Sequence, residues 1–237
     1  MYRVQKVLSL LGILSRRDCE KKIKLGLVKI NNEIALIGSK VAIGDKVTYN
    51  NQDYHITTES LNIDTKVLIY NKPQKEIVSR NDPQKRNTVF ENLPKVTGKW
   101  INIGRLDYDS SGLILFTNNG IIANKMMHPS SNILRTYEVI IDGNMDNKKI
   151  KLSLEGIDIG NNEIGKLIDL ISDEEIENKY IVKLNTGKNR EVRRIFSSLN
   201  CKVLKLKRVS YGNIQLGSLK SQCYKYIEVE SLSEYLS

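Results

Sequence analysis

The stretch GRLDYDSSGLILFTNNG, residues 104–120, joins a short polar run with two acids to an unbroken apolar run that ends in a turn. An apolar run of this length between turn residues predicts a buried strand over GLILFT, residues 112–117. Asp107 and Asp109 come directly before it. Two interpretations follow: an ordinary loop that enters a core strand, or a strand that holds an acid in a cleft.

Other runs typical of strands lie on both sides of this stretch, and runs typical of helices separate them. The strand-like runs are VLIY (67–70), RTYEVII (135–141), YIVKLN (180–185), KVLKLKRV (202–209) and YKYIEVE (224–230). The helical runs are NKMMH (124–128) and REVRRIFSSLN (190–200). This order predicts an α+β fold with a mixed, mainly antiparallel sheet and packed helices.

The first 50 residues predict a separate small α/β unit. Apolar residues recur at i, i+3, i+4 and i+7 from Val4 to Leu11, which is typical of an amphipathic helix. Ser15 and Asp18 have the spacing of a capping box for a second helix that stops at Gly26. The runs LVKINN (27–32) and KVTYN (46–50) then read as short strands.

Residues 51–66 are polar and lack a strong period, which suits a linker. We therefore expect a small N-terminal domain over 1–58, a linker over 59–65 and a larger domain over 66–237.

Composition narrows the range of partners. Lys and Arg number 37 against 27 Asp and Glu, and the formal net charge of +10 favours a polyanionic partner, either nucleic acid or an anionic membrane surface. No apolar run approaches the roughly 18 residues of a membrane span, and no cleavage signal follows the N-terminus, so we expect a cytoplasmic protein without membrane contact. Three widely spaced cysteines argue against a disulfide framework or a zinc site. A monomer is the expected state.

Basic residues cluster in two places. The predicted N-terminal helices carry a group that is either a solvated face or a phosphate-binding surface: Arg3, Lys6, Arg16, Arg17, Lys21 and Lys22. The second group extends over 183–208, where Glu191 is the single acid. Because arginines at i, i+3 and i+4 of a helix cannot all face bulk solvent alike, some of Arg190, Arg193 and Arg194 should point into a site. A buried arginine needs an anionic partner, and the acids of 104–120 are candidates.

Several residues admit two interpretations. Tyr137 alternates with Val139 and Ile141, which favours a core position, although a strand tyrosine can also stack on an extruded base and transfer a proton. Asp107 and Asp109 share a face of an extended segment, a spacing compatible with a magnesium-dependent nuclease or a glycosidase. The following serines lack a nucleophile elbow, and neither histidine has a partner pattern for a catalytic triad.

The sequence segments described above resemble two known families. The segments RVQKVLSLLGILSRRDCEKKIKLGLVKINN and IGDKVTY resemble an S4 RNA-binding domain. Nearly the whole chain resembles the ribosomal RNA pseudouridine synthases that join an S4 domain to a catalytic domain, through NKPQKEIVS, INIGRLDYDSSGLILFTNNGIIANKMMHPS, RTYEV and TGKNREVRRIFSSLNCKVLKLKRVSYGNI.

The resemblance implies roles for particular residues. Asp107 is the expected nucleophile, Tyr137 the residue that stacks on the uracil, and Arg193 the cation paired with Asp107. The expected RNA contacts are Arg105, Leu106, Arg3, Lys6, Arg16, Arg17, Lys21, Lys22, Arg135, Lys188, Arg190 and Arg194. Because the isomerisation has no net redox change, no cofactor and no metal are expected.

The expected partner is ribosomal RNA, with a slight preference for the large-subunit RNA, or a ribosomal assembly intermediate. The alternative is a non-catalytic S4-type RNA-binding or ribosome assembly factor, which would bind RNA without modifying it.

The chain departs from the family pattern at four positions. Lys75 replaces the glycine of a KPxG turn, Arg135 replaces a lysine, Asn119 replaces an aspartate, and Glu191 replaces a glutamine. Glu191 places an acid beside the arginines, and we expect it to alter either their pairing or the RNA contact; we expect Lys75 to affect the shape of its loop.

Overall fold

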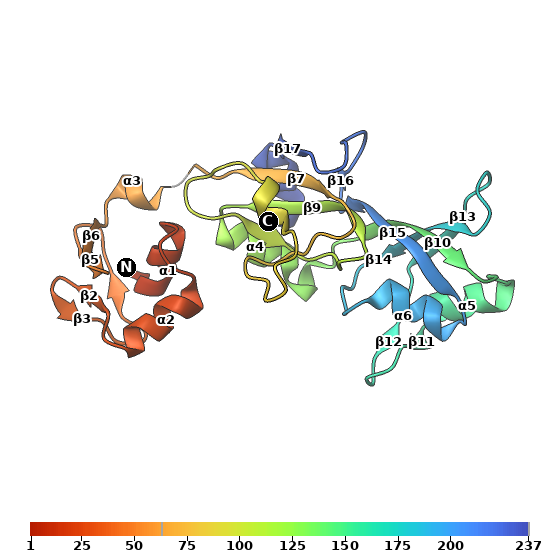
Figure 1. The fold of residues 1–237 in the computed structure, drawn as a ribbon, viewed down its shortest axis with the longest axis horizontal. Coiled ribbons are helices and arrows are strands. Elements are labelled where there is room, and N and C mark those ends of the chain that lie inside the picture. Colours follow the sequence, from red (N-terminus) through yellow and green to blue (C-terminus); the bar gives the residue numbers. More distant parts are fainter. Residues whose placement is uncertain (63, 237) are drawn as a thin grey trace. The chain divides into compact units, whose positions relative to one another are not determined.

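The computed structural model describes residues 1–62 and 64–236, which form two compact units (Figure 1). The first unit contains residues 1–66 together with 94–101 and 117–120. The second contains 67–93, 102–116 and the described chain from Ile121 onward. Residue 63, within the linker expected over 59–65, lies outside the described residues.

The first unit packs two short helices against a small sheet. Its elements are β1 (Tyr2–Arg3), α1 (Val4–Leu10), α2 (Arg16–Lys24), β2 (Val28–Ile30), β3 (Glu33–Ile34), β4 (Lys40–Val41), β5 (Lys46–Tyr49), β6 (Gln52–His55) and α3 (Thr58–Leu61). Ser15 caps α2 by accepting a hydrogen bond from the Asp18 amide at 3.1 Å. Val4, Val7 and Leu8 of α1 are buried in the core of this unit. The expected helix pair and its cap are confirmed.

The first part of the polar segment 51–66 has regular structure. Residues 52–55 form β6, which pairs antiparallel with β5, and the connecting Asn50 and Asn51 both have positive φ. Two left-handed residues in succession make the tight turn that suits the twist of a hairpin. The Asn-Asn pair is therefore the sequence feature that indicates this strand. The interpretation of residues 52–55 as linker was wrong because these residues are polar and lack the apolar pattern typical of a strand.

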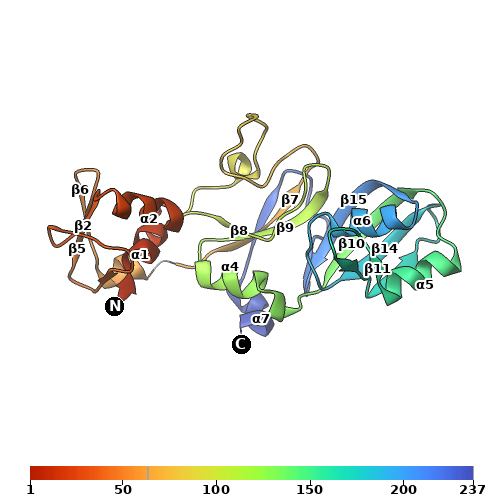
Figure 2. The same ribbon diagram turned by 90° about the horizontal axis from the view of Figure 1, so that it is seen from below.

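The second unit is built on a large sheet, which has nine strands in the described part of the chain (Figures 1 and 2). Its main path runs β13-β14-β10-β15-β9-β7-β17, with β8 beside β9 and β16 beside β15. The strands are β7 (Val67–Lys72), β8 (Ile101–Ile103), β9 (Ser111–Thr117), β10 (Arg135–Asp142), β13 (Asp169–Ser172), β14 (Lys179–Leu184), β15 (Lys202–Tyr211), β16 (Ile214–Gln215) and β17 (Tyr224–Ile227).

The other elements of this unit are α4 (Gly120–Met127), α5 (Asn147–Glu155), β11 (Ile157–Asp158), β12 (Ile164–Gly165), α6 (Glu191–Ser198) and α7 (Ser233–Leu236). Figure 2 shows α5 and α6 at the same end of the sheet, beside β10 and β14. Val192, Ile195 and Phe196 of α6 are buried there with Val139 and Val182 of the sheet.

The sheet is mixed, and a parallel pair of strands carries the opening stretch. β10 is antiparallel to both β14 and β15, whereas β9 and β15 run parallel, with Gly112 opposite Arg208. The expected α+β fold with a mixed, mainly antiparallel sheet is confirmed. The four residues 113–116 of β9 are fully buried, as their apolar run predicts.

Gly112 permits this parallel contact. Its φ is +102°, and a Cβ atom there would lie 2.2 Å from the carbonyl oxygen of Arg208. No side chain fits in that space, and the conformation itself disfavours L residues. The glycine in SSGL therefore lets β9 approach β15 directly after the Asp107 loop.

Candidate active site

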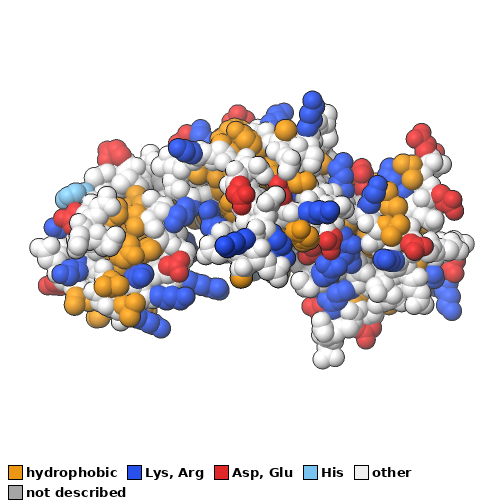
Figure 3. Space-filling model, in the orientation of Figure 1, with side chains coloured by type: hydrophobic (Ala, Val, Ile, Leu, Met, Phe, Trp, Pro, Cys, Tyr) orange, Lys and Arg blue, Asp and Glu red, His pale blue; other side chains and the backbone are white. Residues whose placement is uncertain are grey.

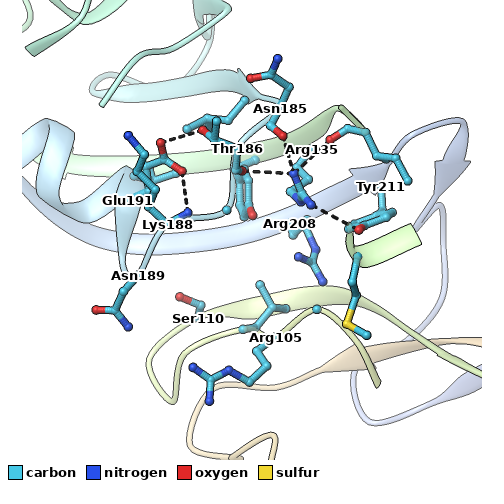
Figure 4. Close-up of a pocket in the computed structure, with 18 of the residues that line it drawn as sticks. Arg105, Ser110, Arg135, Asn185, Thr186, Lys188, Asn189, Glu191, Arg208 and Tyr211 are labelled. Atoms are coloured by element: carbon cyan, nitrogen blue, oxygen red, sulfur yellow. Dashed lines mark hydrogen bonds between the residues drawn. The ribbon is translucent and has the colours of Figure 1, made fainter. Parts of the chain in front are cut away.

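A cavity of about 710 Å³ lies within the second unit, where the loop before β9 faces β10, β15 and the start of α6 (Figure 4). It brings together many of the residues singled out in the sequence: Arg105, Leu106, Asp107, Arg135, Tyr137, Lys188 and Arg190. Arg193 and Arg194 do not line it, and the basic residues of α1 and α2 belong to the other unit.

The loop that carries Asp107 is fixed through its backbone. The carbonyls of Tyr108, Asp109 and Ser110 accept hydrogen bonds from the Lys75 amide at 2.8 Å, the Arg193 guanidinium at 3.1 Å and the Lys72 ammonium at 2.7 Å. These donors come from two separate parts of the second unit, the end of β7 with the turn after it and α6, so the loop cannot shift without breaking several bonds. The half-buried Asp107 is thereby held at the cavity.

Lys75 has a left-handed backbone at the position where the family pattern has glycine. Its φ is +66°, in the left-handed region that glycine adopts most easily. Lys75 therefore holds a conformation that glycine would adopt at lower cost, and its effect on the shape of the loop stays a prediction.

Lys72 is fully buried beneath the loop, where its ammonium also donates to the Pro73 carbonyl at 2.7 Å. Burial lowers the pKa of Lys72 to about 8, and the nearby Glu76, Asp107 and Asp109 oppose that shift. Because the pKa is lower in the folded chain than in the unfolded chain, the unfolded state binds more protons between these values. The free energy of unfolding should therefore rise with pH in this range.

We expect wild type to gain about 2 kcal/mol relative to Lys72→Met when the pH rises from about 7.5 to about 9.5. Urea unfolding followed by circular dichroism at both pH values measures this difference. The other titratable groups contribute equally to the pH dependence of both proteins, so their contributions cancel in the difference between wild type and Lys72→Met. Parallel pH dependences would show that Lys72 is not the buried titrating group.

Arg190, rather than Arg193, forms the ion pair with Asp107. Arg190 precedes α6 with a left-handed backbone, and its Nη1 atom lies 3.7 Å from Asp107 Oδ2 and 4.0 Å from Asp109 Oδ2. Arg193 lies a turn further along α6, where it donates to the carbonyls of Val203 and Asp109 at 3.1 Å each. The expected Arg193–Asp107 pair is thus corrected, since the helix directs Arg193 toward backbone groups.

The pKa of Arg193 depends on the charged groups of the site. Burial lowers its pKa, Arg190 lowers it further, and Asp109 and Asp107 oppose the shift. Its Nε atom is buried without a hydrogen-bond partner in the described part of the chain. Arg193 therefore supports the loop and contributes charge from behind it.

The two arginines should differ in their effect on stability. Arg193→Ala leaves two carbonyls unpaired and should lower the free energy of unfolding by about 2 kcal/mol. Arg190→Ala removes an ion pair whose side chains are 45% and 31% exposed, and should cost less than about 1 kcal/mol. Urea denaturation of both variants measures the contrast, and the reverse order would assign the structural role to Arg190.

Arg194 and Glu191 serve the local structure. Arg194 pairs with Glu163 at 2.5 Å and donates to the carbonyls of Ile159 and Gly160, so it anchors the β11–β12 hairpin instead of reaching the cavity. The buried Glu191 accepts from the Thr186 hydroxyl at 2.7 Å and from the Lys188 amide at 3.0 Å. These contacts hold the Glu191 carboxylate against the loop at 186–188, and an effect of Glu191 on the pairing of the arginines or on the RNA contact stays a prediction.

Arg135 and Tyr137 both lie on β10. The Arg135 guanidinium donates to the carbonyls of Asn185 and Thr186 and to the Tyr211 hydroxyl (Figure 4). Tyr137 is half-buried, packs against the core and also lines the cavity. The side chain of Tyr137 is therefore partly in the core and partly at the cavity, and its stacking on a base stays a prediction.

The basic residues of the first unit lie on its helices. Lys6 is on α1, and Arg16, Arg17, Lys21 and Lys22 are on α2, while Arg3 directly precedes α1. Figure 3 shows Lys and Arg side chains gathered over the α2 region of this unit. This face is basic, as expected.

Several residues at or beneath the cavity were not assigned to the site from the sequence, and four of them are polar groups that bear on its chemistry: Lys72, Ser110, Arg208 and Tyr211. The sequence contains a weak indication that Arg208 is buried, because Arg208 follows the buried Leu206 by two residues on a strand and so shares its face. The others read as ordinary strand or loop residues, and only tertiary structure brings them together.

The magnesium interpretation lacks donors. In the part of the chain that the structure describes, no group of three or more His, Cys, Asp or Glu residues could hold a metal ion. Asp107 and Asp109 instead share Arg190. Among the described residues, no helix is long and apolar enough to cross a membrane.

A basic helical unit joined to an α+β unit, whose cavity contains a clamped carboxylate and several arginines, fits an enzyme that acts on RNA. Residues 66–198 match the family model described as RNA pseudouridylate synthase, and residues 3–47 match the S4 domain. The chain belongs to the RNA pseudouridylate synthase family, in the group that carries an S4 domain.

Curated relatives span most of the chain. It is 43% identical over 221 residues to the ribosomal large subunit pseudouridine synthase B of Buchnera aphidicola subsp. Schizaphis graminum, covering 90% of this chain and 85% of that one. The protein of the same name from Escherichia coli O6:H1 is 39% identical over 217 residues, with coverages of 90% and 75%.

A solved structure shares the fold. The structure described as a pseudouridylate synthase covers 99% of this chain and 100% of its own, with a TM-score of 0.69 and 23% sequence identity. This similarity supports the architecture of both units.

Proposed function

We propose that this enzyme isomerises a uridine of ribosomal large-subunit RNA to pseudouridine, with Asp107 as the nucleophile. The supporting observation is the Asp107 loop, whose three successive carbonyls are held by Lys75, Arg193 and Lys72 at the edge of the cavity. The names of the curated relatives support the choice of large-subunit RNA.

The reaction breaks the bond between C1′ of the ribose and N1 of uracil and forms a bond between C1′ and C5. The proton on C5 is lost, and N1 gains one. Asp107 acts as a covalent catalyst at the sugar, and Arg190 supplies the neighbouring positive charge. Because bonds are exchanged without net oxidation or reduction, the chain needs no redox cofactor.

The target base must leave its stack before it reaches the cavity, at a cost of a few kcal/mol. Tyr137 lines the cavity and offers a ring for stacking, and Arg105 is an exposed cation at the same loop. The basic residues on α1 and α2 contribute phosphate contacts that offset the cost. We further propose that the enzyme is a cytoplasmic monomer that acts on ribosomal RNA or on an assembling ribosomal particle.

Carbodiimide mapping of pseudouridine tests the function. Unmodified large-subunit and small-subunit RNA transcripts are incubated with wild type or Asp107→Asn in EDTA, and reverse-transcription stops are compared. A new stop in large-subunit RNA with wild type alone is the expected result.

The same assay is repeated on precursor large subunits from cells that lack the enzyme. Tight RNA binding without a stop in either substrate would contradict the proposal and favour a non-catalytic assembly factor.

A further inference from the structure

Arg208 presents an unusual buried cation at the cavity. It lies on β15, is 2% exposed and lines the cavity with Asp107. Its Nε atom donates to the Leu113 carbonyl at 2.7 Å, and its guanidinium lies 5.2 Å from the centre of the Tyr211 ring. Its Nη2 atom is buried without a hydrogen-bond partner in the described residues. Figure 4 shows the guanidinium on the side of β15 that faces the loop of Ser110.

A buried arginine of this kind is costly without a partner. Across the described chain, no carboxylate oxygen forms an ion pair with Arg208 within 4.0 Å, and the Tyr211 ring compensates for only part of its desolvation. An N–H group that stays unsatisfied in the folded protein carries a desolvation penalty. Such a donor at a cavity wall is explained when a ligand supplies the acceptor.

Ser110 provides a second polar atom of the same kind. It is 1% exposed, lines the same cavity, and its hydroxyl has no hydrogen-bond partner in the described part of the chain. It follows Asp107 on the clamped loop, so its position is fixed relative to the nucleophile. Two residues that line the cavity thus carry a buried N–H donor and a buried hydroxyl, and neither atom has a hydrogen-bond partner within the described part of the chain.

The chemistry of these groups favours a neutral base over a phosphate. Phosphates stay solvated and suit exposed cations such as Arg105 and Arg190. Uracil presents two carbonyl oxygens on either side of an N–H group, which matches one guanidinium N–H and a hydroxyl that can donate or accept. Cytosine has an amino group at position 4 instead of a carbonyl oxygen. A hydrogen-bond donor of the protein at that position would therefore face another donor.

Building on the proposed function, we propose that Arg208 binds the uracil of the target nucleotide by donating a hydrogen bond from Nη2 to one of its carbonyl oxygens. Ser110 binds the same edge of the base. Arg208 is thus a substrate-binding residue, and where it contacts O4 it also excludes cytosine.

Atom substitution in the RNA tests this contact. The target found by carbodiimide mapping is placed in a short RNA as uridine, 2-thiouridine or 4-thiouridine, because sulfur accepts hydrogen bonds more weakly than oxygen. Single-turnover kcat/KM is measured for wild type, Arg208→Lys and Arg208→Met. We expect one thio substitution to slow wild type about tenfold and to slow the Arg208 variants about twofold or less. The thio position that responds identifies the oxygen that Arg208 contacts.

Three results separate the explanations. A purely structural Arg208 would lower the rate of all three RNAs by the same factor and leave the thio effect intact, which would overturn the proposal. No thio effect in wild type would also overturn it. Failure of wild type to isomerise the uridine RNA would instead overturn the proposed function.

Lys207→Gln is the matched control, because Lys207 neighbours Arg208 on β15 but does not line the cavity. This variant is expected to keep the thio effect of wild type. Circular dichroism measures whether each variant is folded. If Arg208→Met does not fold, the test uses Arg208→Lys, which retains the buried charge.

Discussion

Replacing Asp107 with asparagine is expected to lower the single-turnover rate of pseudouridine formation by about 10⁴-fold or more, because the amide cannot act as the nucleophile. The side chain keeps its size, and the ion pair with Arg190 is partly exposed, so folding stability should change by less than about 1 kcal/mol. RNA affinity should remain within about threefold, since the phosphate contacts do not involve Asp107. Single-turnover assays and filter binding measure these two quantities.

Asp109→Asn is the matched control for this prediction. Asp109 is exposed, lies two residues away and has its carboxylate 4.0 Å from the same Arg190 atom. Its side chain does not line the cavity, so we expect activity within about tenfold of wild type. Loss of activity in Asp109→Asn with an active Asp107→Asn would assign the nucleophile to Asp109.

The elements that sequence predicted well are those with strong local patterns. The apolar run of β9, the periodicity of α1 and the cap of α2 each depend on neighbouring residues, and the structure contains all three. The strand β6 was missed because its residues are polar, although the Asn-Asn turn before it favours a hairpin. The local sequence therefore predicted an element best where its buried residues are apolar and its exposed residues are polar.

The partners within the site could not be predicted in the same way. Whether Arg190 or Arg193 reaches Asp107 depends on how α6 is rotated against the sheet, which its own sequence does not determine. The clamp of Lys72 on the Ser110 carbonyl joins residues 38 positions apart. The approach of Arg208 to the cavity depends on the parallel register of β9 and β15. These relationships arise only when distant strands align.

That register depends on Gly112, and Gly112→Ala is expected to destabilise β9 and β15 by about 4 kcal/mol or more. The added Cβ atom would lie 2.2 Å from the Arg208 carbonyl oxygen and 2.7 Å from its amide nitrogen, and both are backbone atoms that cannot rotate away. The strands must separate to accept it, which moves the Asp107 loop and Arg208 together. Native-state hydrogen exchange of the β9 and β15 amides measures the local loss.

Gly160→Ala separates this contact from the cost of the backbone conformation. Gly160 also has a positive φ, +81°, but a Cβ atom there would meet nothing within 4 Å. Its substitution should cost only about 1–2 kcal/mol and leave exchange in β9 and β15 unchanged. Equal losses in the two variants would mean that backbone conformation, rather than the contact with Arg208, makes glycine necessary at position 112. A larger loss in Gly112→Ala would show that the absent side chain sets the distance between the two strands that carry the nucleophile loop and Arg208.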